Sequence, residues 1–87
     1  MNLPEEFQQA VAKSKQFTKR PDNEELLELY ALYKQATEGD VAEERPGGFD
    51  FKAIAKHDAW ANKKGMVPEQ AVEKYIAFVG ELEKRYA

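Results

Sequence analysis

The last nineteen or so residues carry apolar side chains at helical spacing, and this pattern restricts the possible fold more than any other feature. The side chains recur at steps of three or four residues: Val72, Tyr75, Val79, Leu82 and Tyr86. Side chains at these steps lie on one face of an α-helix. The pattern therefore predicts a helix from Pro68 to Tyr86 that buries this face against the rest of the chain.

Three earlier segments also have helical character, and no segment alternates as a half-buried strand does. The expected helices span about Leu3 to Phe17, Asp22 to Gly39 and Asp50 to Lys63. With 87 residues, the chain is expected to form one domain, residues 1–87. The predicted fold class is all-α, a four-helix bundle.

Several predicted helix ends have a recognisable local chemistry. Asp22 and Glu25 have the spacing of a capping box, in which each side chain accepts from a backbone N–H of the other residue. Gly39 is expected to end the second helix, because glycine adopts positive φ freely. Asn2 is expected to cap the first helix, with Pro4 in its first turn.

The second and third helices are separated by the stretch DVAEERPGGF. A connection of about ten residues is longer than most links between neighbouring helices in a bundle. A long connection permits a crossover, so a simple up-down-up-down order does not follow from the sequence.

Composition excludes several classes of function. The chain has 13 basic and 16 acidic residues, a net charge of -3, so no overall positive field attracts nucleic acid. No segment has the roughly 20 apolar residues of a membrane-spanning helix, and stable membrane insertion is not expected. The absence of cysteine and of an N-terminal apolar run leads us to expect a cytoplasmic protein.

The second predicted helix has an apolar and aromatic face that is too wide for packing on one neighbour. On a helical wheel this face covers about 220°, against the 100° or so that a core-facing stripe needs. The opposite, solvent-facing side is predicted to hold Glu24, Glu28, Ala31 and Gln35. Part of the wide face therefore needs a partner other than the core.

Tyr30 and Lys34 lie at one edge of this face, four residues apart, with Leu27 beside them. A phenol, a cation and an apolar side chain together suit a ligand that combines phosphate, an aromatic base and hydrocarbon. The competing interpretation is purely structural. In it, the tyrosine lies at the edge of the core and the lysine lies in solvent near the negative end of the helix.

The third predicted helix is the most basic one, with Lys52, Lys56, Lys63 and Lys64. Trp60 is expected to be a core anchor on this helix. The sequence leaves open whether Lys56 belongs to a solvated face or to a binding site.

Three stretches of the chain resemble the acyl-CoA-binding protein family, also known as diazepam-binding inhibitor. They are PDNEELLELYALYKQATEGD, ERPGGFDFKAIAKHDAWANKKG and AVEKYIAFVGELEKRY. The resemblance implies a bundle with up-down-down-up order. It also implies a carrier that binds medium- to long-chain acyl-CoA esters non-covalently, one per molecule. Such a carrier is expected to be monomeric and to need no cofactor. Enzymes that use acyl-CoA are further expected partners.

The resemblance also implies site residues. The adenine and 3′-phosphate of CoA are expected to contact Lys15, Tyr30, Tyr33, Lys34, Lys56 and Tyr75. The acyl chain is expected to lie on Phe7, Ala10, Leu26 and Leu27. The sequence departs from the family at His57, where a tryptophan is common, and at Ile54, where a lysine is common. These departures affect the packing beside the groove and one phosphate contact.

The residues also bear on two other classes of function. An enzyme is not expected, because His57 is the only histidine and its neighbour Asp58 should point elsewhere on the helix. Nucleophilic catalysis by cysteine and phosphate binding by a glycine-rich loop also lack their residues. The alternative function is a helical module that binds a partner protein through the wide face of the second helix.

Overall fold

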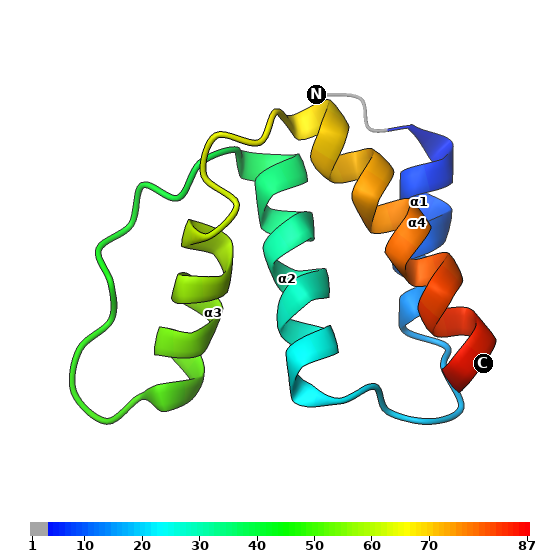
Figure 1. Cartoon of the computed structure of the whole chain (residues 1–87), viewed down its shortest axis with the longest axis horizontal. Helices are drawn as coiled ribbons and strands as arrows, with labels where there is room; N and C mark the ends of the chain where they lie inside the picture. Colours follow the sequence, from blue (N-terminus) through cyan, green and yellow to red (C-terminus); the bar gives the residue numbers. More distant parts are fainter. Residues whose placement is uncertain (1–3) are drawn as a thin grey trace.

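The computed structural model describes residues 4–87 and contains four α-helices. They are α1 (Glu5–Ser14), α2 (Asn23–Glu38), α3 (Phe51–Ala61) and α4 (Pro68–Tyr86). Residues 4–87 contain no β-strand, which confirms the all-α fold class (Figure 1).

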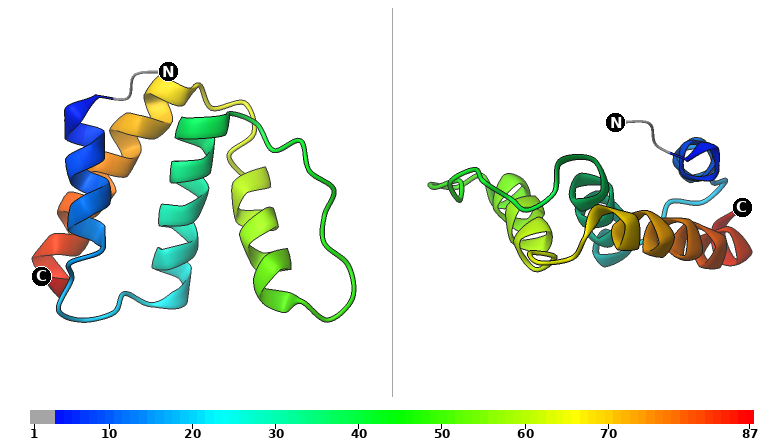
Figure 2. Two further views of the ribbon diagram at one scale, coloured as in Figure 1. Left: turned by 180° about the vertical axis from the view of Figure 1, so that it is seen from behind. Right: turned by 90° about the horizontal axis from the view of Figure 1, so that it is seen from above.

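The helices form a flat arrangement with extents of 36 × 29 × 15 Å. Helices α1 and α4 run in one direction, and α2 and α3 run in the other (Figure 1). Helix α2 lies between α3 and α4, and α1 packs on α4 (Figure 2). The up-down-down-up order is thereby confirmed, and it brings the first turns of α2 and α3 to the same end of the molecule.

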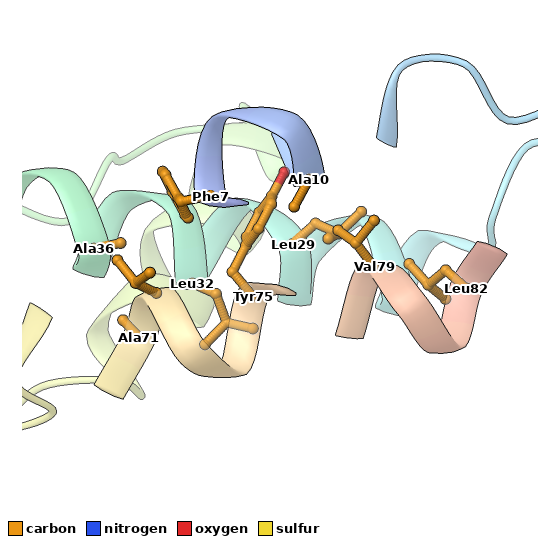
Figure 3. Packing of buried hydrophobic residues seen from close by; sticks show 10 residues of the cluster. Phe7, Ala10, Leu29, Leu32, Ala36, Ala71, Tyr75, Val79 and Leu82 are labelled. Carbon is orange, nitrogen blue, oxygen red and sulfur yellow. The ribbon is translucent and has the colours of Figure 1, made fainter. Parts of the chain in front are cut away.

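The main core lies where α1, α2 and α4 meet (Figure 3). Its buried members are Phe7, Ala10, Leu29, Leu32, Ala36, Ala71, Val72, Tyr75, Val79 and Leu82. The apolar face predicted for Pro68–Tyr86 supplies four of them, Val72, Tyr75, Val79 and Leu82. Burial of these side chains supplies the main favourable term in folding.

Helix α3 packs on the other side of α2 and has its own anchor. Trp60 is buried, as predicted, and its indole Nε1 donates a hydrogen bond to the carbonyl oxygen of Gly39 at 2.8 Å. This contact joins α3 to the end of α2.

One prediction about α2 is wrong. Ala31 and Gln35, which were assigned to the solvent-facing side, are completely buried. Helix α3 packs on α2, and Gln35 Nε2 donates to Asp40 Oδ1 and to the carbonyl oxygen of Met66, both at 2.8 Å. Helix α2 therefore packs on two sides, and only the part of its wide face between these two sides stays accessible.

Helix α1 is shorter than predicted. Pro4 precedes it in an extended conformation, so it does not lie in the first turn, and Asn2 lies outside the described residues. The helix ends at Ser14 and not at Phe17. Beyond it, the backbone N–H groups of Thr18 and Lys19 donate to the carbonyl oxygen of Tyr86, at 2.8 and 3.1 Å. This oxygen belongs to the last turn of α4, which needs donors from outside the helix.

The other helix ends agree better with the sequence. The capping box of Asp22 and Glu25 is present, and Gly39 ends α2 with φ of 78°. Helix α3 begins after Asp50, whose side chain accepts from the backbone N–H of Ala53. It ends at Ala61 and not at Lys63, because the chain tightens into a turn in which Lys63 N–H donates to Trp60 O at 2.9 Å.

The long connection between α2 and α3 is held against α3 by two contacts. Arg45 donates two hydrogen bonds to the carboxylate of Asp58, at 2.9 and 3.0 Å. His57 Nε2 donates to the carbonyl oxygen of Glu43 at 3.0 Å. A bidentate ion pair thus connects the sequence stretches ERPG and DAW, and this is the strongest geometry for such a contact.

Candidate functional site

A groove of about 720 Å³ runs between the N-terminal halves of α2 and α3. It is lined by Arg20, Asn23, Leu26, Leu27, Tyr30, Phe51, Lys52, Ala55 and Lys56. These residues include three cations and no carboxylate, although the chain as a whole is acidic. The groove therefore combines apolar surface with a local positive charge.

Tyr30 and Lys56 meet across the groove, one from each helix. The Lys56 ammonium lies 5.3 Å from the centre of the Tyr30 ring, within the range of a cation–π contact. Lys52 precedes Lys56 by one turn and therefore projects from the same face of α3. A cation beside a partly exposed ring suits a ligand that has both a phosphate group and an aromatic base.

Leu26 and Leu27 form the apolar part of the groove together with Ala55 and Phe51. Both leucines are only half-buried. Leu26 also packs against the main core, whereas Leu27 does not. An aliphatic chain placed on them would remove more apolar surface from water.

Lys34 lies one helical turn beyond Tyr30, further along α2. Its ammonium forms an ion pair with Glu38 and lies 4.9 Å from the centre of the Trp60 ring. The hydrogen bond to the Glu38 carboxylate raises the pKa of Lys34, so the side chain is charged at neutral pH. A ligand phosphate must compete with Glu38 for this cation.

A second aromatic group lies on the side of α2 that faces α1. The Phe7 ring stacks on the Tyr33 ring at 6.0 Å and lies 5.0 Å from the Tyr75 ring, measured between ring centres. Tyr75 is buried, its hydroxyl lies 3.3 Å from Ser14 Oγ, and burial raises its pKa. Tyr33 is 40% exposed and is the member of this group that a ligand reaches most easily.

The structure divides the ten predicted residues among several places. Tyr30, Lys56, Leu26 and Leu27 line the groove, and Lys34 lies one turn away. Tyr33, Tyr75 and Phe7 form the second aromatic group. Ala10 is buried in the core, and Lys15 is exposed directly after α1.

Five residues of the groove were missed by the sequence analysis as site residues: Arg20, Asn23, Phe51, Lys52 and Ala55. Lys52 could have been found, because it lies four residues before Lys56. Arg20 lies in the connection between α1 and α2, and its position beside α3 depends on the tertiary fold.

The surroundings of His57 correct one expectation. Asp58 does not point away from it, since His57 Nδ1 lies 3.6 Å from Asp58 Oδ1. This distance is too long for a hydrogen bond, and the Asp58 carboxylate is already bound by Arg45, which lowers the pKa of Asp58. The arrangement holds the α2–α3 connection in place.

Among residues 4–87, no group of three or more His, Asp or Glu side chains is close enough to hold a metal ion. No α-helix in this part of the chain is long and apolar enough to cross a membrane.

Comparison with known proteins gives consistent matches over almost the whole chain. The family described as "Acyl CoA binding protein" matches residues 4–79. An acyl-CoA-binding protein homolog of Drosophila melanogaster is 47% identical over 98% of this chain and 99% of its own length. The acyl-CoA-binding protein of Dictyostelium discoideum is 46% identical over 93% of this chain and 96% of its own length.

Solved structures agree with these matches. The crystal structure of acyl-CoA-binding protein 2 of Oryza sativa has a TM-score of 0.88 and 42% sequence identity, and the match covers 92% of this chain and 89% of that one. The solution structure of the yeast acyl coenzyme A binding protein has a TM-score of 0.74 and 45% identity over 92% of this chain and 93% of that one.

Proposed function

Since the chain belongs to the acyl-CoA-binding protein family, we propose that it binds medium- to long-chain acyl-CoA esters non-covalently and carries them in the cytoplasm. The observation that supports this most directly is the groove between α2 and α3. There the Tyr30–Lys56 pair adjoins the half-buried Leu26 and Leu27. One region thus offers both a phosphate-binding cation and apolar surface for an acyl chain.

The CoA part of the ligand is proposed to bind at the Tyr30–Lys56 end of the groove. The adenine stacks on the partly exposed ring of Tyr30, and Lys56 binds the 3′-phosphate as a mobile point charge. Lys34 also binds the phosphate, once its ion pair with Glu38 is broken. Tyr33 supplies a phenol hydroxyl as a hydrogen-bond donor. Lys15, directly after α1, and Tyr75 of α4 complete this proposed set.

The acyl chain is proposed to lie on Leu26 and Leu27. Phe7 and Ala10 of α1 belong to the same proposed set, although both are buried in the main core. An acyl chain that touched them would have to displace part of this packing.

The proposed role is carriage without chemistry, by one monomeric domain of residues 1–87. The Asp58 carboxylate is held by Arg45 and is not free to orient His57 as a base. Enzymes that make or use acyl-CoA are the proposed partners.

Thermal unfolding tests the proposed function. A ligand that binds only the folded chain stabilises it by about 2.7 kcal/mol at a concentration of 100 times Kd. For a domain of this size, we expect palmitoyl-CoA to raise Tm by about 10 °C or more under these conditions. Free palmitate and free CoA at equal concentration should raise Tm much less. A protein-binding module without a small-molecule ligand would show the same Tm in all samples, and this result would disprove the carrier function.

Replacement of Lys56 by methionine tests the phosphate-binding end. Methionine keeps most of the side-chain volume and removes the charge. A hydrogen bond to a charged group contributes about 1.5–3 kcal/mol, so we expect palmitoyl-CoA to bind roughly tenfold to hundredfold more weakly by calorimetry. Lys74→Met is the matched control, since Lys74 is an exposed lysine on α4 that does not line the groove. Equal affinity of both variants would remove Lys56 from the site.

A further inference from the structure

Two phenylalanine side chains project into solvent at the start of α3, and the fold does not use them. Phe49 is 90% exposed and Phe51 is 71% exposed, the largest exposed fractions among the exposed large hydrophobic residues in the described part of the chain. Their rings contact each other edge to face, with centres 6.3 Å apart. Exposed aromatic pairs of this kind are uncommon on a surface that serves only to keep a protein in solution.

Cations lie beside this pair. Phe51 lines the groove together with Arg20, Lys52 and Lys56. Three exposed carboxylates are also near in sequence. Asp50 accepts from Ala53 N–H, Asp22 accepts from Glu25 N–H, and Glu24 lies in the first turn of α2. The α1–α2 connection, which carries Lys19 and Arg20, and the first turn of α3 lie at the same end of the molecule (Figure 1).

We propose that this end of the molecule docks on anionic membrane surfaces, with Phe49 and Phe51 inserted among the lipid headgroups and Arg20 and Lys52 against the lipid phosphates. Aromatic side chains favour the boundary between water and hydrocarbon, and basic side chains are attracted to anionic lipid. The proposal rests on the proposed function, because an acyl-CoA ester is itself an amphiphile that dissolves in membranes. Because Arg20, Phe51 and Lys52 also line the groove, a carrier docked by this end can take the ester up directly.

The size of the surface favours a membrane over a protein partner. Two adjacent rings offer far less area than the roughly 1,000 Å² that a specific protein interface needs. Insertion of two rings suffices only for weak, reversible membrane binding. Even a single lipid anchor gives binding that is marginal and reversible. Weak binding suits a carrier that has to leave the membrane again.

The test uses the ligand-free chain, so that its result does not depend on acyl-CoA binding. Sedimentation with sucrose-loaded vesicles of phosphatidylcholine and phosphatidylserine measures the partition coefficient. We expect binding that weakens with added salt and with removal of phosphatidylserine. Phe49→Ser should lower the partition coefficient about tenfold, the effect of removing most of one buried aromatic side chain.

Val67→Ser is the matched control. Val67 is 55% exposed in the connection between α3 and α4, at the other end of the groove-bearing helices. We expect its partition coefficient to equal that of the unchanged chain. Phe49→Trp supplies a second measurement, because its fluorescence should shift to the blue on vesicles while the buried Trp60 stays constant.

Three results would overturn the proposal. The first is absence of vesicle binding by the unchanged chain, and the second is equal binding by the Phe49→Ser and Val67→Ser variants. The third is a loss of palmitoyl-CoA affinity in Phe49→Ser without vesicles that is as large as its loss of vesicle binding, because Phe49 would then belong to the ligand site. Normal vesicle binding together with no palmitoyl-CoA binding would disprove the proposed function but would still support the membrane-docking surface.

Discussion

Replacement of Phe7 by alanine is expected to lower the free energy of unfolding by about 3–5 kcal/mol. The Phe7 ring is only 1% exposed, and it contacts the rings of Tyr33 and Tyr75 at 6.0 and 5.0 Å between centres. Its removal takes away apolar burial and leaves a cavity between α1, α2 and α4. Since a domain of this kind has about 5–15 kcal/mol in total, urea unfolding should show a much earlier transition.

Phe51→Ala is the matched control for this prediction. It makes the same change at a side chain that is 71% exposed, so we expect a change within about 0.5 kcal/mol. A loss below about 1 kcal/mol for Phe7→Ala would mean that α1 is not packed on the core as the structure has it.

A second variant separates the core role of Phe7 from its proposed contact with the acyl chain. Phe7→Leu keeps an apolar side chain and should leave the chain folded. If Phe7 serves the core alone, palmitoyl-CoA affinity will change little in this variant. If the acyl chain displaces α1 and reaches this residue, affinity for long-chain esters will change while affinity for free CoA does not.

The sequence predicts helices well where the signal is local. The capping box of Asp22 and Glu25 and the positive φ of Gly39 are determined within one turn, and both are present. The predicted end of α1 was wrong. The segment after α1 binds the carbonyl oxygen of Tyr86, which lies at the opposite end of the chain. No pattern in residues 3–17 contains this information.

The burial of Ala31 and Gln35 could not be predicted for a related reason. A helical wheel shows which side chains share a face, but it does not show how many neighbours a helix has. Helix α2 packs on α4 and on α3 together, so a polar glutamine is buried and bonded to Asp40 and Met66. The prediction that part of the wide face lacks a helix partner is supported by the half-buried Leu27 in the groove.

The groove was partly predictable. Tyr30 and Lys56 are the expected residues, and they meet across it although they lie on different helices. Arg20 lies in the connection between α1 and α2, and Phe51 is the first residue of α3. Their positions beside the groove depend on the parallel course of α2 and α3. The sequence contains these residues but not the long crossover geometry that brings them together.

The parallel course of α2 and α3 gives the groove a direction, with Tyr30 and Lys56 toward one end. The other end holds Leu26, Leu27 and Phe51 together with Arg20 and Lys52. Affinity for acyl-CoA should therefore consist of two separable parts. The charged part is set by the CoA end and does not depend on acyl length. The apolar part grows with each methylene that the groove covers, by up to about 0.8 kcal/mol.

We expect affinity to rise about tenfold for each two methylenes added between octanoyl-CoA and palmitoyl-CoA, until the groove is filled. Titration calorimetry across this series gives the slope of log Kd against chain length. Leu27→Ser should lower the slope, because it replaces apolar surface of the groove with a hydroxyl, and should leave the affinity for free CoA unchanged. Lys56→Met should weaken all members equally and keep the slope. A flat response in the unchanged chain would contradict an apolar groove between α2 and α3, and an equal change of slope in both variants would contradict the division of the affinity into a charged and an apolar part.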